Sequence, residues 1–151
     1  MRTYLVVIDE TEEARTALHY AAVRAIRLGR TVEILALIPP AEFVNWAAVE
    51  ATFEEEARRR AEAAVAQAAS ELVETTGVHP VIKVKRGDPV KMVREAIEES
   101  PDIAGLMLGA AADGSPGPLV AYFAGAGAGS MPCPIIVVPG GLSFEELEKL
   151  G

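Results

Sequence analysis

Short apolar runs alternate along the chain with longer segments in which apolar residues recur at helical spacing. The first run, 4–8, is continuous, which is typical of a strand buried on both faces of a parallel sheet. Further runs predict strands over 31–38, 81–85, 103–108 and 134–138. The run 81–85 alternates polar and apolar residues, so we place it nearer an edge of the sheet.

The segments between these strands carry start and stop signals for helices. Thr11 and Asp88 stand at N-cap positions, Gly29 and Gly77 are natural stops, and Ser143 opens a capping box. The predicted helices cover 12–28, about 48–74, 89–99, about 119–127, and a short segment after 143.

Strand–helix alternation predicts an α/β fold: an open, doubly wound parallel five-stranded sheet with helices on both faces. We expect a single domain over 1–151, with 143–151 as a short C-terminal helix or tail. Ligands of such sheets bind outside the carboxyl ends of the strands. The positions to consider are therefore Asp9, Ile38, 87–88 and 109–118.

Charge and composition exclude several classes of partner. Lys and Arg total 14 and Asp and Glu total 22, giving a net charge of −8. Such a surface disfavours nucleic acids and anionic membranes. No apolar run is long enough to span a membrane, and Cys133 has no partner for a disulfide, so we expect a cytoplasmic protein. Two histidines and one cysteine provide few soft metal ligands, and we predict no metal site.

The turn after the first strand argues against two large nucleotide-binding classes. Residues 9–13 contain no glycine and three glutamates beside Asp9, so the dinucleotide fingerprint is absent and phosphates would be repelled. No Walker A motif occurs anywhere in the chain. A phospho-receiver domain would need a lysine after the fifth strand, where Val137-Val138-Pro139 stands. No acid, base or nucleophile set suggests an enzyme.

Two features keep both a functional and a structural interpretation. Asp9 could accept hydrogen bonds from a ribose or an adenine amino group, or it could cap the following helix. In the loop 109–118, glycines could let the backbone approach a phosphate, or they could only shape turns. The small residues Gly125 to Ser130 favour a frayed helix end over a close backbone approach to a ligand or another chain.

Other conspicuous residues favour ordinary structural roles. We expect His19 and His79 at the surface or on a helix side, and Cys133 as a small buried hydrophobe. Phe43, Val44 and Trp46 could form an aromatic lid, but packing under the second helix or at a dimer contact is favoured. The aromatic Phe53 is expected on the buried stripe of that helix.

Several motifs together resemble the universal stress proteins of the UspA type across nearly the whole chain. No single motif is specific, but their order and spacing are. They are Leu5-Val6-Val7-Ile8-Asp9, Thr11-Glu12-Glu13-Ala14, Ala17-Leu18-His19-Tyr20-Ala21-Ala22, Leu28-Gly29, Gly87-Asp88-Pro89, Leu106-Met107-Leu108-Gly109 and Pro132-Cys133-Pro134-Ile135-Ile136-Val137-Val138-Pro139.

The resemblance implies a fold like that of the adenine-nucleotide alpha-hydrolases, with strand order 3-2-1-4-5. It also implies a homodimer formed along the fifth strand. The residues of that expected interface are Pro134, Ile135, Ile136, Val137 and Val138.

Some members of the family bind ATP, through Gly-x2-Gly-x9-Gly-Ser/Thr after the fourth strand. Here Gly109 matches the first glycine, but Ala112 takes the second position and Ala121-Tyr122 the final pair. A second register, Gly114 and Gly117 followed by Gly127-Ala128, reproduces the glycine spacing but begins five residues late.

The adenosine half of the family's site survives better. The resemblance places Asp9, after Val7 and Ile8, near an adenosine, and gives the backbone of Ile38 the role of reading adenine. The candidate ligand-binding residues are Val7, Ile8, Asp9, Ile38, Leu108, Gly109, Ala112, Gly114 and Gly117.

The sequence therefore favours a non-enzymatic, homodimeric stress-response module with a lost or weakened nucleotide site. The alternative is an ATP or AMP binder that uses a variant glycine loop, with slow ATP hydrolysis. A third hypothesis, an enzyme of another class on the same layered sheet, has no residue set to support it.

Overall fold

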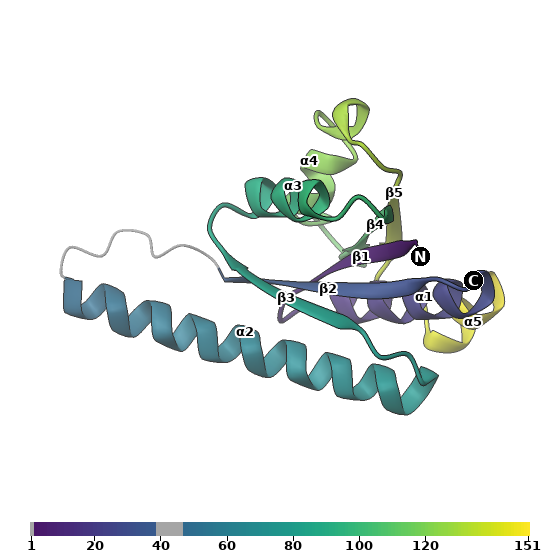
Figure 1. The fold of residues 1–151 in the computed structure, drawn as a ribbon, viewed down its shortest axis with the longest axis horizontal. Helices are drawn as coiled ribbons and strands as arrows, with labels where there is room; N and C mark the ends of the chain where they lie inside the picture. Colours follow the sequence, from purple (N-terminus) through teal and green to yellow (C-terminus); the bar gives the residue numbers. More distant parts are fainter. Residues whose placement is uncertain (1, 39–46) are drawn as a thin grey trace.

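The computed structural model describes residues 2–38 and 47–151, so Phe43, Val44 and Trp46 lie outside the described residues. Five parallel strands form one sheet in the order β3-β2-β1-β4-β5, as the resemblance implied (Figure 1). The strands are β1 (Thr3–Ile8), β2 (Thr31–Ile38), β3 (Val81–Arg86), β4 (Ile103–Ala110) and β5 (Ile135–Pro139). The alternating strand β3 lies at an edge, as predicted.

Helices cover both faces of this sheet, which confirms the doubly wound α/β prediction (Figure 1). One face carries α1 (Glu12–Leu28), α2 (Ala47–Thr76) and α5 (Phe144–Leu150). The other carries α3 (Pro89–Glu99) and α4 (Pro118–Phe123). A 3-10 turn at Ala128–Ser130 leads into β5.

Strand β1 lies at the centre of both hydrophobic layers. Leu5 and Val7 pack with α3 and α4, whereas Val6 and Ile8 pack with α1 and α2. In the sheet register Val6 lies beside Ile34 of β2 and Met107 of β4, and all three side chains are fully buried. This burial on both faces explains why the run 4–8 is continuously apolar.

Local signals start most helices where the sequence predicts. The Asp88 side chain accepts a hydrogen bond from the Lys91 backbone N–H at 3.0 Å, and Ser143 and Glu146 form the expected capping box. Thr11 does occupy the N-cap position of α1. Its hydroxyl, however, donates to Asp9 Oδ1 instead of accepting from the helix, so the expected Thr11 cap does not form.

Two element ends differ from the sequence prediction. Strand β4 continues two residues past Leu108 and takes Gly109 into the sheet. Helix α4 ends at Phe123, and turns replace the rest of the predicted 119–127 helix, with the Gly127 N–H bonded to the Tyr122 carbonyl at 2.9 Å. The frayed-helix interpretation of Gly125 to Ser130 is confirmed, since interior glycines weaken helices.

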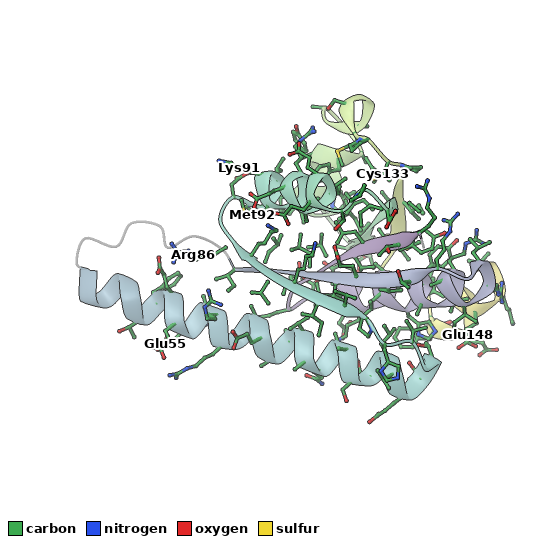
Figure 2. All side chains as sticks on the ribbon, in the orientation of Figure 1. Glu55, Arg86, Lys91, Met92, Cys133 and Glu148 are labelled. Carbon is green, nitrogen blue, oxygen red and sulfur yellow. The ribbon has the colours of Figure 1, made fainter. Side chains whose placement is uncertain are left out.

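Three side-chain placements also differ from prediction. His19 is buried, with 4% exposure, because the Phe144 ring of α5 stacks on it at a centroid distance of 4.1 Å. Cys133 is only half-buried, on the α3 and α4 side of the sheet, and that burial raises the pKa of its thiol (Figure 2). Phe53 is 41% exposed rather than on the buried stripe of α2. His79 is exposed, as expected.

Gly109 lies where the end of β4 meets the first turn of α1. A Cβ at this position would overlap the carbonyl oxygen of Glu13 and approach the Ala14 nitrogen to 3.0 Å. Only a glycine therefore allows the helix to start this close to the sheet. The bare backbone at Gly109 serves contact between strand and helix.

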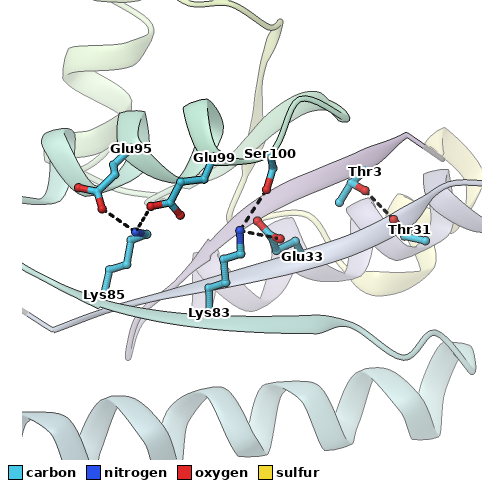
Figure 3. A network of polar contacts seen from close by, with 8 residues as sticks. All are labelled: Thr3, Thr31, Glu33, Lys83, Lys85, Glu95, Glu99 and Ser100. Atoms are coloured by element: carbon cyan, nitrogen blue, oxygen red, sulfur yellow. Dashed lines mark hydrogen bonds and ion pairs between the residues drawn. The ribbon is translucent and has the colours of Figure 1, made fainter.

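Lysines tie the edge strand β3 to α3 and to the adjacent strand (Figure 3). Lys85 Nζ donates to Glu95 Oε1 and Glu99 Oε1, at 2.8 Å each. Lys83 Nζ lies 3.0 Å from Ser100 Oγ and 3.4 Å from Glu33 Oε1. The hydrogen bonds to Glu95 and Glu99 raise the pKa of Lys85, and the bond from Lys85 lowers the pKa of Glu99.

We predict that Lys85→Met lowers the free energy of unfolding at pH 7 and that this loss shrinks in acid. Glu99 has a lowered folded pKa, so its contribution is present above its ordinary value of 4.5 and is lost as pH falls through the folded pKa. Lys85 has a raised pKa, so its contribution is present below 10.5 and is lost as pH rises through the folded value. Urea unfolding of both proteins at pH 7 and pH 3 measures this.

Lys91→Met, at an exposed position of the same helix, is the matched control and should change stability little. A Lys85→Met effect of equal size at both pH values would show that the ion pairs contribute nothing.

We also predict that Gly109→Ala destabilises the protein by about 1–3 kcal/mol, because the added methyl group forces β4 and α1 apart. At Gly129, a Cβ would meet no atom within 4 Å, so Gly129→Ala should stay within about 0.5 kcal/mol of wild type. Chemical unfolding curves compare the two substitutions. Equal stability of both variants would refute the close-contact argument.

Candidate ligand site at the carboxyl ends of the strands

A cleft of about 130 Å³ opens between the turn after β1 and the loop that leads into α4. It joins five of the predicted residues: Val7, Asp9, Leu108, Gly109 and Gly117. Pro116 and Pro118 belong to the loop 109–118 that the sequence analysis singled out. The rest of the lining was missed, namely Thr11, Glu13, Ala14, Leu119 and Val120. Binding sites for small molecules usually measure about 300–1,000 Å³, so this cleft is small.

Asp9 is engaged within its own turn. Its Oδ1 accepts hydrogen bonds from the Thr11 backbone N–H at 2.8 Å and from the Thr11 hydroxyl at 2.5 Å. The carboxylate thus holds the chain at the start of α1, which is the structural interpretation of this residue. The side chain is nevertheless exposed and faces the cleft, so it remains accessible to a ligand.

The glycines of the loop after β4 are required by its turns. Gly114 and Gly117 have φ values of +73° and +111°, which residues with a side chain rarely adopt. The Ala111 N–H donates to the Pro116 carbonyl at 3.2 Å and closes the loop. Gly117 lines the cleft, whereas Ala112 and Gly114 do not.

Tyr122, in the final pair of the expected phosphate motif, does not line the cleft. Its hydroxyl accepts a hydrogen bond from Arg94 Nη2 at 3.0 Å, and its ring lies under the same guanidinium. A Cβ at Gly127 would overlap that ring. Gly127, which the second register of the glycine motif assigns to the phosphate site, therefore leaves space for the Tyr122 ring.

Ile38 is fully buried and is not among the residues that line the cleft. Its carbonyl oxygen accepts a hydrogen bond from the Gly87 N–H at 3.2 Å, which continues the pairing of β2 with β3. One of the backbone groups at the predicted adenine-reading position is thus already used within the sheet.

The charge of the cleft is negative. Asp9 and Glu13 are its ionisable lining residues, and neither lysine nor arginine is among them. Two like charges 4 Å apart repel by about 1 kcal/mol in water and about 4 kcal/mol near a protein surface. Glu12 and Glu13 also occupy the first turn of α1, where the helix dipole would otherwise favour an anion. The lining therefore suits a neutral or cationic group better than a phosphate.

A second cleft of about 300 Å³ lies on the other side of Asp9, against α2. Ile8 and Leu37 contribute apolar walls, and Arg60 lies 3.5 Å from Glu10 through its Nε. The full lining is Ile8, Asp9, Glu10, Thr11, Leu37, Ala57, Arg60, Ala61 and Ala64. The three alanines recur at helical spacing, and this row of small residues was the available sequence signal for the α2 wall.

Within the described part of the chain, no three side chains of His, Cys, Asp or Glu are arranged to share a metal ion. Its helices also include none with the length and apolar character needed to cross a bilayer.

Comparison with known proteins identifies solved structures with the same fold. A universal stress protein UspA from Lactobacillus plantarum aligns with a TM-score of 0.73 and 19% identity, over 91% of this chain and 97% of that one. One from Archaeoglobus fulgidus, in complex with dAMP, aligns with a TM-score of 0.63 and 15% identity, over 91% and 98%. An Arabidopsis thaliana family member with AMP bound aligns with a TM-score of 0.54 and 14% identity, over 92% of each chain.

No curated protein sequence matches the chain significantly. A model of the universal stress protein family, however, matches residues 1–139. This match spans both clefts and all five strands. The chain is a member of the universal stress protein family.

Proposed function

We propose that the chain is a non-enzymatic, homodimeric stress-response module of the cytoplasm whose nucleotide site no longer holds phosphate. The observation that carries this proposal is the negative, cation-free lining of the cleft at the ends of β1 and β4. The backbone of Gly109, the one matching glycine of the phosphate motif, is packed against Glu13. A triphosphate would need lysine, arginine or free backbone amides at this place.

The direct test is to look for nucleotide in the protein as purified. After denaturation, anion-exchange chromatography of the supernatant should show no ATP, ADP or AMP. Millimolar ATP should also leave the thermal unfolding midpoint unchanged, since a ligand stabilises only in proportion to its binding to the folded state. Co-purified ATP would refute the proposal.

The homodimer is proposed to form along β5. This edge strand presents Ile135, Ile136 and Val137, and Val137 is 37% exposed. Antiparallel pairing of two copies about Val137 would place only uncharged side chains opposite one another. The other edge, β3, carries Lys83, Lys85 and Arg86, and charged edge residues discourage pairing between chains.

We predict that Ile136→Lys converts the dimer to a monomer of 16.0 kDa, because a cation at the paired edge must be buried without a partner. Sedimentation velocity measures the change. Val137→Lys, at a more exposed position, tests the same edge with less risk to folding. Val81→Lys, on the β3 edge, is the control and should remain dimeric. A dimer that survives both β5 substitutions would exclude this interface.

A second candidate function is binding of AMP or ATP through the variant loop. Two observations favour it: the 300 Å³ cleft beside Asp9 is large enough for a nucleoside, and relatives have been solved with AMP and dAMP bound. In this case Asp9 would accept a hydrogen bond from the ribose, and Arg60, which lines the same cleft, would pair with one phosphate. Asp9→Asn should then weaken nucleotide binding, whereas without a nucleotide site it changes only the turn at Thr11.

A further inference from the structure

Residues 140–151, beyond the match to the family model, form a helical arm fixed to α1. Leu147 of α5 is buried, with 1% exposure, and Phe144 stacks on His19. Arg27 of α1 donates to the carbonyl oxygens of Glu148, at 2.5 Å, and of Gly151. Contacts at both ends of α5 therefore set its orientation.

A groove of about 260 Å³ separates this arm from the edge strand β5. The side chains that line it are apolar, apart from the hydroxyl of Tyr20. Its lining consists of Tyr20, Ile136, Val137, Val138, Pro139, Leu142, Leu147 and Leu150. The groove carries no charged residue, which is the composition of an interface core rather than of an ordinary surface.

Leu150 projects from the last turn of α5 at the margin of the groove. Its side chain is 63% exposed, the largest exposed fraction among the large apolar residues that the structure describes. An apolar side chain and an apolar groove thus lie on one face, beside an open strand edge. A two-fold interface places each protomer's projecting residue against the same surface of its partner.

We propose that α5 docks across the β5 edge onto a second copy of this chain, with Leu150 seated in the partner's groove. This inference rests on the proposed β5 dimer and adds a chain-specific arm to it. The polar side of the arm fits an interface rim, since Glu145 and Lys149 pair with each other at 3.7 Å and stay exposed. The arm then covers apolar surface that edge pairing alone would leave in water.

The test is the dimer dissociation constant of Leu150→Lys, measured by sedimentation equilibrium. Leu150→Lys removes the burial of an apolar side chain that favours association. The two-fold symmetry applies the substitution twice, so we expect dissociation to become at least about tenfold easier. Leu150→Met, which keeps the volume and the apolar character, should retain the wild-type constant.

Phe53→Lys is the matched control, because Phe53 is an exposed apolar residue on a helix. It belongs to the part of α2 near Glu55, at the opposite end of the molecule from Glu148 of α5 (Figure 2). This variant should dimerise like the wild type. Circular dichroism and unfolding midpoints equal to wild type verify that the variants are folded.

The outcomes separate this inference from the β5 dimer itself. If Ile136→Lys gives a monomer and Leu150→Lys leaves the dissociation constant unchanged, the arm is not part of the interface and the inference is wrong. If the wild type is monomeric, or if both β5 variants stay dimeric, the proposed dimer fails and the docking inference fails with it.

Discussion

The contact between Gly109 and the first turn of α1 determines the shape of the candidate ligand site at the carboxyl ends of β1 and β4. The helix begins so close to β4 that the Glu13 carbonyl occupies the space of a side chain at position 109. The turn after β1 must then be tight, and Asp9 holds it through Thr11. The cleft left between this turn and the α4 loop measures only about 130 Å³. Packing, rather than phosphate binding, therefore accounts for the glycine.

Electrostatics at this edge agree with the packing. Glu12 and Glu13 stabilise the positive start of α1, and this role is independent of any ligand. The same carboxylates repel a phosphate that approaches the helix start. The acidic residues at the carboxyl ends of the strands therefore stabilise the start of α1. Exposed apolar surface lies instead at the β5 edge strand and on α5.

Elements that depend on local sequence could be predicted well. The continuous run of β1, the Asp88 cap and the Ser143 capping box are determined by neighbouring residues, and they form as expected. His19 could not be placed, because its burial depends on Phe144, which is distant in the sequence. Tyr122 belongs to the final pair of the expected phosphate motif, but its ring turns toward Arg94 on α3.

The candidate site was predictable only in part for the same reason. Strand ends identified Val7, Asp9 and Leu108, because parallel strands place their carboxyl ends at one edge. The side of the second cleft that α2 forms, with Arg60, could not be predicted, because it depends on how this long helix crosses the carboxyl ends of the strands. The role of Gly109 depends on the distance between two elements, which no pattern of glycines reveals.

The most direct test of the proposal that this site holds no phosphate is a calorimetric titration of the apo protein with adenosine, AMP and ATP, at low and high salt. We expect that affinity does not rise with the number of phosphates. Any binding of the charged ligands should improve as salt screens the carboxylates of Asp9 and Glu13. Affinity that increases from adenosine to ATP and weakens with salt would contradict this account.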